Sequence, residues 1–160
     1  MSSICLIETS IFLNFLNVTN CNQDRELVLK DYKIYVESGC TFLLPMATII
    51  ETGNHIAQNG NGTIRRKTAI HFVAEVKAAF KGEAPWSLTQ FLEAKEMLLW
   101  IDNFPDLAGR NKAADKYEGT SFGDLSIIEE FNKSCKRFPM REVFIWSLDS
   151  DLNSYHQNAK

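Results

Sequence analysis

The sequence predicts a three-layer α/β/α domain with helices on both faces of a short, mostly parallel central sheet. Short apolar runs alternate along the chain with longer segments of helical spacing. Strands separated by helices favour parallel pairing, with helices covering both faces of the sheet. The chain has 160 residues, 45% of them hydrophobic and 23% charged, which fits one globular domain over residues 1–160.

The first half of the chain predicts two strands and four helices. The apolar run Ile4–Ile7 predicts the first strand, and Ser10 follows it where a hydroxyl can cap a short helix. The turn-rich stretch Asn17–Asn22 ends that helix, and NGNG at 59–62 is a second sharp break. The other elements are expected as helix, strand, helix and helix at Arg25–Glu37, Thr41–Leu44, Ala47–Gln58 and Thr63–Phe80.

The second half predicts three more helices and a strand. Ser87 and Gln90 have the spacing of a capping box, which indicates a helix that runs to about Asn103. A short helix, a helix opened by Asp124 and a last strand are expected at Leu107–Tyr117, Asp124–Lys136 and Val143–Trp146. In such a fold the functional crevice lies at the carboxyl ends of the strands.

Composition limits the classes of function and location. No apolar run reaches the ~18 residues of a membrane-spanning helix, and the first ten residues lack the basic region of a signal peptide. The four cysteines are scattered without a C-x-x-C pair, as expected for thiols in a reducing compartment, so we expect a cytoplasmic protein without a membrane partner. With a net charge of −3, binding to nucleic acid would need a local basic patch.

Four carboxylates stand among apolar neighbours, unlike the other acids of the chain. Glu8 follows the first predicted strand, and Asp149 follows the last one with Asp151 close behind. The carboxyl ends of parallel strands meet at one edge, so these acids should lie near each other. Glu51 falls about one turn into the helix after the second strand, and Asp124 opens a later helix.

Each acid also has a simpler explanation. Asp124 could be a helix N-cap, Asp149 a turn residue, Glu51 a partly exposed helix residue, and Glu8 the partner of a lysine or arginine. Together, however, four carboxylates in one crevice would raise one another's pKa, and a divalent cation would relieve the repulsion. Oxygen ligands suit Mg²⁺ or Mn²⁺, and the sequence has no His/Cys cluster that favours zinc.

Four segments in this order resemble the PIN-domain family of metal-dependent nucleases: LIETSIFLNFL, LLPMATIIETGNHI, FGDLSIIEE and VFIWSLDSDL. The resemblance extends over nearly the whole chain. It implies that Glu8, Glu51, Asp124 and Asp149 are catalytic acids that hold Mg²⁺ or Mn²⁺, with Asp151 as a further metal ligand. It also implies a PIN-like fold.

The resemblance assigns supporting roles to two hydroxyl groups. Ser10 matches the residue that steadies the first acid, and Ser147 matches the small polar residue two positions before the last acid. The chain departs from the family at Glu8, where an aspartate is usual, and the segment between Glu51 and Asp124 is longer than in compact members.

The implied activity is that of a metal-dependent endoribonuclease, with a toxin–antitoxin or defence role. RNA would be the substrate, and an antitoxin or another regulatory protein and a second copy of the chain are expected partners. The alternative is a catalytically inactive PIN-like module that binds RNA or protein, which the glutamate at position 8 favours. Phosphotransfer is disfavoured because the chain has neither D-x-D-x-[TV] after the first strand nor a phosphate-binding P-loop.

Substrate binding requires cations, and they gather in two places along the chain. Either group could bind phosphates or form a solvated charged face: Arg65, Arg66 and Lys67 in the first, and Lys133, Lys136, Arg137 and Arg141 in the second. Trp100 and Trp146 are expected in the core, whereas Trp86 is the candidate stacking platform for a base. His55, one turn after Glu51, could contact substrate or take a surface role.

Overall fold

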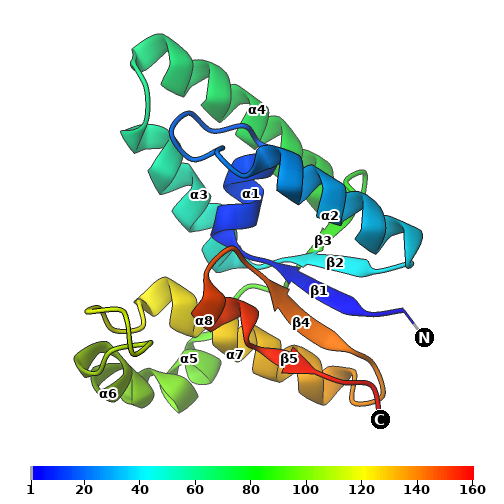
Figure 1. Cartoon of the computed structure of the whole chain (residues 1–160), viewed down its shortest axis with the longest axis vertical. Coiled ribbons are helices and arrows are strands. Elements are labelled where there is room, and N and C mark those ends of the chain that lie inside the picture. The colour runs from blue at the N-terminus through cyan, green and yellow to red at the C-terminus, as the bar shows by residue number, and fades with distance from the viewer. Residues whose placement is uncertain (1) are drawn as a thin grey trace.

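The structure is a computed structural model that describes residues 2–160. Its sheet has the strand order β3-β2-β1-β4-β5, and only the last pair is antiparallel (Figure 1). The strands are β1 (Ile4–Ile7), β2 (Thr41–Leu44), β3 (Trp86–Leu88), β4 (Val143–Trp146) and β5 (His156–Gln157). The prediction of an α/β fold with a mostly parallel sheet is therefore confirmed.

The central strand β1 is buried along its whole length because both faces of the sheet are covered. Successive side chains of a strand point to opposite faces. Ile4 and Leu6 accordingly pack in one hydrophobic cluster, and Cys5 and Ile7 pack in the other. A run of four apolar residues without polar alternation is what such a strand requires.

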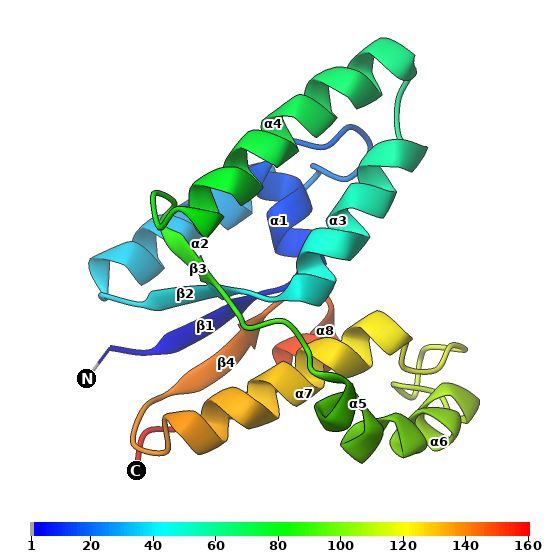
Figure 2. The same ribbon diagram turned by 180° about the vertical axis from the view of Figure 1, so that it is seen from behind.

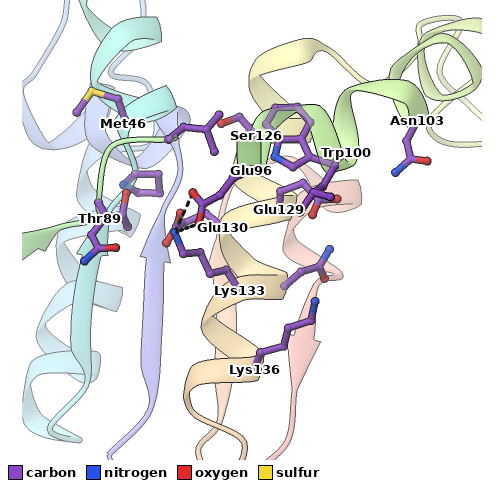
Figure 3. Close-up of a pocket in the computed structure, with 15 residues that line it drawn as sticks. Met46, Thr89, Glu96, Trp100, Asn103, Ser126, Glu129, Glu130, Lys133 and Lys136 are labelled. Atoms are coloured by element: carbon purple, nitrogen blue, oxygen red, sulfur yellow. Dashed lines mark hydrogen bonds and ion pairs between the residues drawn. The ribbon is translucent and has the colours of Figure 1, made fainter. Parts of the chain in front are cut away.

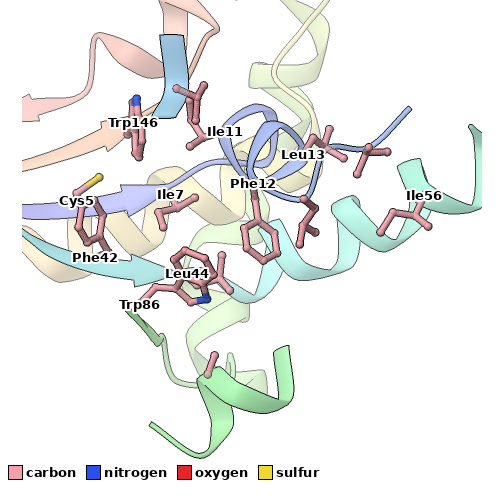
Figure 4. Close-up of a cluster of buried hydrophobic side chains, with 14 residues drawn as sticks. Cys5, Ile7, Ile11, Phe12, Leu13, Phe42, Leu44, Ile56, Trp86 and Trp146 are labelled. Carbon is pink, nitrogen blue, oxygen red and sulfur yellow. The ribbon is translucent and has the colours of Figure 1, made fainter. Parts of the chain in front are cut away.

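One face of the sheet carries the first four helices, α1 (Thr9–Phe15), α2 (Arg25–Glu37), α3 (Met46–Gln58) and α4 (Gly62–Phe80). Figure 4 shows their shared core, in which Phe12 of α1 meets the ring of Trp86 edge to face at 5.5 Å. Trp86 is only 7% exposed, so the prediction that it offers a stacking platform is wrong. Trp100 and Trp146, which are 6% and 4% exposed, are buried as predicted.

The other face carries α7 (Phe122–Arg137) and α8 (Ser150–Asn153). Beyond α7 lie α5 (Ala94–Trp100), the 3₁₀ helix η1 (Ile101–Asn103) and α6 (Phe104–Gly109), as Figure 2 shows. The ring of Phe122 packs against Trp100 at 5.5 Å and against Phe104 at 5.1 Å, which holds this extra helical material to the start of α7. No helix within residues 2–160 is long and apolar enough to cross a bilayer.

Two predicted elements of the second half are wrong. Ser87 lies in strand β3, and the helix begins only at Ala94, where Glu93 and Glu96, instead of Ser87 and Gln90, make the capping box. The short helix occupies Phe104–Gly109 instead of Leu107–Tyr117. Pro105 explains the earlier start, because its fixed φ angle and missing N–H suit the first turn of a helix.

The N-caps of two helices also differ from the predictions. Glu8, not Ser10, caps α1, because the Glu8 carboxylate accepts the N–H of Ser10. Ser121, not Asp124, caps α7 by accepting the Asp124 N–H at 3.0 Å. Asp124 therefore lies in the first turn of the helix, and its carboxylate is left for another role.

Arg141 belongs to the amino-terminal edge of the sheet. Its guanidinium donates to the carbonyl of Ser2 at 2.6 Å, to the carbonyl of Ser3 at 3.2 Å and to the hydroxyl of Thr41 at 3.2 Å. These contacts join the ends of β1, β2 and β4. Arg141 is therefore a structural residue, and the expectation that it forms a phosphate-binding patch with its neighbours is wrong for this side chain.

The buried sheet predicts a large difference between two apolar truncations. Ile145→Ala in β4, where the side chain is fully buried, should lower the free energy of unfolding by about 2–5 kcal/mol. The matched change Leu98→Ala, at a side chain 69% exposed on α5, should alter it by less than ~0.5 kcal/mol. Urea denaturation followed by circular dichroism measures both, and equal losses would contradict the assigned core.

Candidate functional site

Four acids from four separate segments line one cleft at the carboxyl-terminal edge of the sheet. The cleft has a volume of about 460 Å³. Glu8 follows β1, Glu51 lies on α3, Asp124 is in the first turn of α7, and Asp149 precedes α8 after β4. The other lining residues are Thr9, Ser10, Leu13, Asn54, His55, Gln58, Lys112 and Ser121.

Glu8 is fixed by hydrogen bonds that all end on one of its oxygens. Oε2 accepts from the Ser10 N–H at 2.9 Å, from the Ser10 hydroxyl at 2.5 Å and from the Ser147 hydroxyl at 2.9 Å. Each hydroxyl in turn accepts a backbone N–H, Ser10 from Leu148 and Ser147 from Asp149, both at 3.0 Å. These N–H donors orient the hydroxyl protons toward Oε2. Within residues 2–160 no hydrogen bond ends on Oε1, which leaves that oxygen for a ligand.

Burial raises the pKa of Glu8 above its usual value, and the charge of Asp149 raises it further. The hydrogen bonds from Ser10 and Ser147 act in the opposite direction without cancelling the effect of burial. The simpler explanation that a lysine or arginine pairs with Glu8 is wrong, because its partners are hydroxyls and a backbone amide. A buried carboxylate held without a counter-ion is costly, and it therefore indicates a functional position.

Glu51 is positioned by α1 and by the first turn of α7. The hydroxyl of Thr9 donates to its Oε2 at 2.6 Å. At Gly123 an added Cβ would lie 1.7 Å from Glu51 Oε1, so a larger residue there would push the Glu51 carboxylate away from the start of α7. The unpaired N–H groups of a first helical turn favour negative charge, which suits a carboxylate at this point.

Asp124 faces the cleft from the first turn of α7, with only 9% of its surface exposed. Burial raises its pKa, and the nearby charge of Glu51 raises it further, whereas Lys112 lowers it. The explanation of Asp124 as an N-cap is wrong, since Ser121 has that role. Asp149 does take an N-cap position, at α8, but its side chain makes no capping hydrogen bond there.

Two lysines from the loop between α6 and α7 bind the acids of the cleft. Lys112 Nζ lies 2.8 Å from Glu118, 3.8 Å from Asp124 and 3.9 Å from Asp151. Lys116 Nζ lies 2.9 Å from Asp151 and 3.5 Å from Asp149. Asp151, which was expected as a further metal ligand, is thus the shared partner of both lysines and is not among the residues that line the cleft.

The donor set fits a hard cation, but its spacing is not that of a formed metal centre. The acids offer only oxygen, and Glu8, Asp124 and Asp149 line the same cleft. Among residues 2–160, however, no three Asp, Glu, His or Cys side chains are spaced to hold a metal ion. Lys112 lies between Asp124 and Asp151, so the carboxylates would have to close together around an ion.

The cations expected to bind substrate lie outside this cleft. Arg65 donates to the carbonyl of Gly60 at 2.9 Å, whereas Arg66 and Lys67 line a separate hollow at the start of α4. Lys133 and Lys136 line a cavity of about 350 Å³ on the α5–α7 side, where Lys133 pairs with Glu96 at 3.2 Å (Figure 3). Neither group of cations therefore lines the cleft that contains the four acids.

Comparison with family models, with curated proteins and with solved structures found no match to this chain. The PIN-like character of the fold and of the site therefore stays a prediction.

Several residues that the geometry brings to the site were not predicted from the sequence. Thr9 directly follows Glu8, and a hydroxyl next to a candidate acid was a usable signal. Gly123 directly precedes Asp124, and a glycine inside the first turn of a helix also invites a search for a close neighbour. Lys112 and Lys116 lie in a loop whose path no periodicity predicts.

The raised pKa of Glu8 predicts that the carboxylate costs stability near neutral pH. A carboxyl whose pKa is higher in the folded state binds more protons there, so stability falls as pH rises from the ordinary value of 4.5 through the folded value. Glu8→Gln keeps an oxygen that accepts from both serines. It should be more stable than the unchanged protein at pH 7, with the difference shrinking toward pH 4.

Urea denaturation at a series of pH values measures this difference. A Glu8→Gln protein that is less stable than the unchanged chain, by a margin that grows toward neutral pH, would contradict the assigned direction.

Proposed function

We propose that this protein is a metal-dependent endoribonuclease of the PIN type that cleaves RNA phosphodiester bonds. One observation carries the proposal. Four carboxylates, separated by up to 141 positions between Glu8 and Asp149, line a single cleft with oxygen-only ligands. Repelling charges are kept together at a cost in stability, which is common where they serve a function.

Glu8, Asp124 and Asp149 would hold Mg²⁺ or Mn²⁺, with Glu51 as a direct or water-mediated ligand. When bound, such an ion activates water for attack on phosphorus and stabilises the charge that develops on the phosphoryl and leaving oxygens. The hydroxyls of Ser10 and Ser147 would keep Oε2 of Glu8 occupied, so that Oε1 faces the ion. Thr9 would orient Glu51 in the same way.

Residues of α3 supply the polar groups that would contact substrate. Asn54 and His55 are exposed and line the same cleft as the acids. An RNA strand that runs along α3 from these residues would pass the end of the helix at Gln58. Arg66 and Lys67 lie beyond that point, in the first turns of α4. RNA phosphates beyond the cleavage site would bind these cations. The resemblance adds a toxin–antitoxin or defence setting, with an antitoxin, a regulatory protein or a second copy as partner.

A specific observation also favours the second candidate, an inactive module that binds RNA or protein. The lysines Lys112 and Lys116 already neutralise Asp124, Asp149 and Asp151 in part. An acidic cleft whose charges are balanced permanently would not recruit an ion. The two candidates differ in whether a divalent ion binds and whether RNA is cut.

Substitution of one acid separates the candidates. Asp124→Asn keeps the size of the side chain and removes its charge. The unchanged protein should degrade single-stranded RNA with Mn²⁺ or Mg²⁺. The variant should cleave RNA more than about a hundredfold more slowly, because loss of a group that only orients a metal ligand already costs 10–100-fold, and Asp124 would be a ligand itself. Gel analysis of end-labelled RNA measures the rates, with Asp102→Asn, at an exposed aspartate of η1, as the matched control.

Equal activity in the Asp124→Asn protein would indicate a contaminating nuclease and contradict the assigned site. An unchanged protein that binds RNA but cuts none of a broad panel would favour the binding module instead.

A further inference from the structure

We propose that Lys112 and Lys116 form an internal latch, which holds the acids of the cleft in the ion-free protein and is displaced when a divalent ion binds. This inference rests on the proposed function, because it assumes that an ion enters the cleft. It adds a regulatory property to the site: the ion and the two lysines compete for the same carboxylates.

The contacts of the latch fall on the groups that an ion would need. Lys116 pairs with Asp149 at 3.5 Å, and Lys112 lies 3.8 Å from Asp124. Asp151 also lies 2.9 Å from Lys116 and 3.9 Å from Lys112, which ties α8 to the loop before α7. An ion bound to Asp124 and Asp149 would place positive charge close to both ammonium groups, which is unfavourable.

The loop that carries the latch is joined to α6 by backbone contacts and to α8 by the two lysines. Its base is tied to α6, where the N–H of Thr120 donates to the carbonyl of Leu107 at 3.0 Å and Gly119 packs directly on the backbone of Ala108. Within residues 2–160, the hydrogen bonds and ion pairs that join residues 110–120 to Asp149 and α8 all come from the two lysines. Once these pairs break, the tip of the loop can move while its base stays in place.

The loop itself holds the two lysines as one unit. The N–H of Lys112 donates to the carbonyl of Glu118 at 2.9 Å, and Ala113 and Lys116 form an isolated bridge. The carboxylate of Glu118 also forms an ion pair with the ammonium group of Lys112 at 2.8 Å. Lys112 therefore keeps a partner inside the loop when it moves away from Asp124. The Lys112 side chain is only 10% exposed, and a partner that travels with it lowers the cost of its displacement.

Competition for shared carboxylates has two measurable consequences. Removal of the lysine charges should strengthen ion binding, and ion binding should loosen the loop, because the coupling between two binding events is reciprocal. Neither consequence depends on cleavage of RNA. Both are observable in the protein with Mn²⁺ alone.

The first experiment is calorimetric titration of the protein with MnCl₂. We expect Mn²⁺ to bind the Lys112→Gln/Lys116→Gln protein roughly 5- to 150-fold more tightly than the unchanged chain, the usual range of coupling between two ligands. Lys33→Gln on α2, which removes an exposed lysine whose ion pair within residues 2–160 is with Glu37, is the matched control and should leave the affinity unchanged. Lys116→Arg keeps the cation and should bind Mn²⁺ nearly as weakly as the unchanged chain.

The second experiment is hydrogen exchange of the unchanged protein, which decides the question even if the double variant fails to fold. Backbone amides of residues 112–118 should exchange faster with saturating Mn²⁺ than without it.

The outcomes separate the latch from the proposed function. Equal Mn²⁺ affinity of the unchanged and double-variant proteins, or unchanged exchange at residues 112–118, would overturn the latch and leave the metal site standing. Absence of Mn²⁺ binding in both proteins would overturn the proposed function, and the latch with it. Binding by the double variant alone would be the strongest support for the latch.

Discussion

Repulsion between carboxylates at one edge of the sheet is the constraint on which the rest of this site depends. The acids are held by different kinds of contact. Glu8 is held by two oriented hydroxyls. Glu51 is held by the Thr9 hydroxyl and lies against Gly123 at the start of α7. Asp124 and Asp149 are held by lysines from a loop. The fold therefore already contains positive charge where the proposed function requires an ion.

The parallel sheet is what brings these contacts together. Because β1, β2 and β4 run in the same direction, the segments that follow them all begin at the same edge. The parallel pairing of β1 with β4 sets Ile7 beside Trp146, so Glu8 and Ser147, the next residue after each strand, lie within hydrogen-bonding reach although 139 positions separate them. A cleft lined by several negative carboxylates is unfavourable for stability, and the apolar layers on both sides of the sheet compensate for this cost.

The strands at Ile4–Ile7 and Val143–Trp146 could be predicted from the sequence, because each is a run of four apolar residues between polar ones, which is too short for a helix. The sequence was insufficient for Trp86–Leu88, since a three-residue strand shows little alternation and Ser87 imitates a helix cap. The strand ends likewise predicted that Glu8 and Asp149 would share an edge, whereas Glu51 and Asp124 were grouped with them by the resemblance. Neither the strand ends nor the resemblance could predict Lys112 and Lys116, whose place depends on the path of a loop and not on any local pattern.

A crystal structure of the protein soaked in MnCl₂ is the direct test of whether these acids bind a divalent ion. We expect an anomalous manganese peak in the cleft within coordination distance of Glu8, Asp124 and Asp149, with the ammonium groups of both lysines withdrawn from Asp124 and Asp149. A cleft without a peak at saturating Mn²⁺, or carboxylates still paired with the lysines beside an ion bound elsewhere, would contradict this expectation.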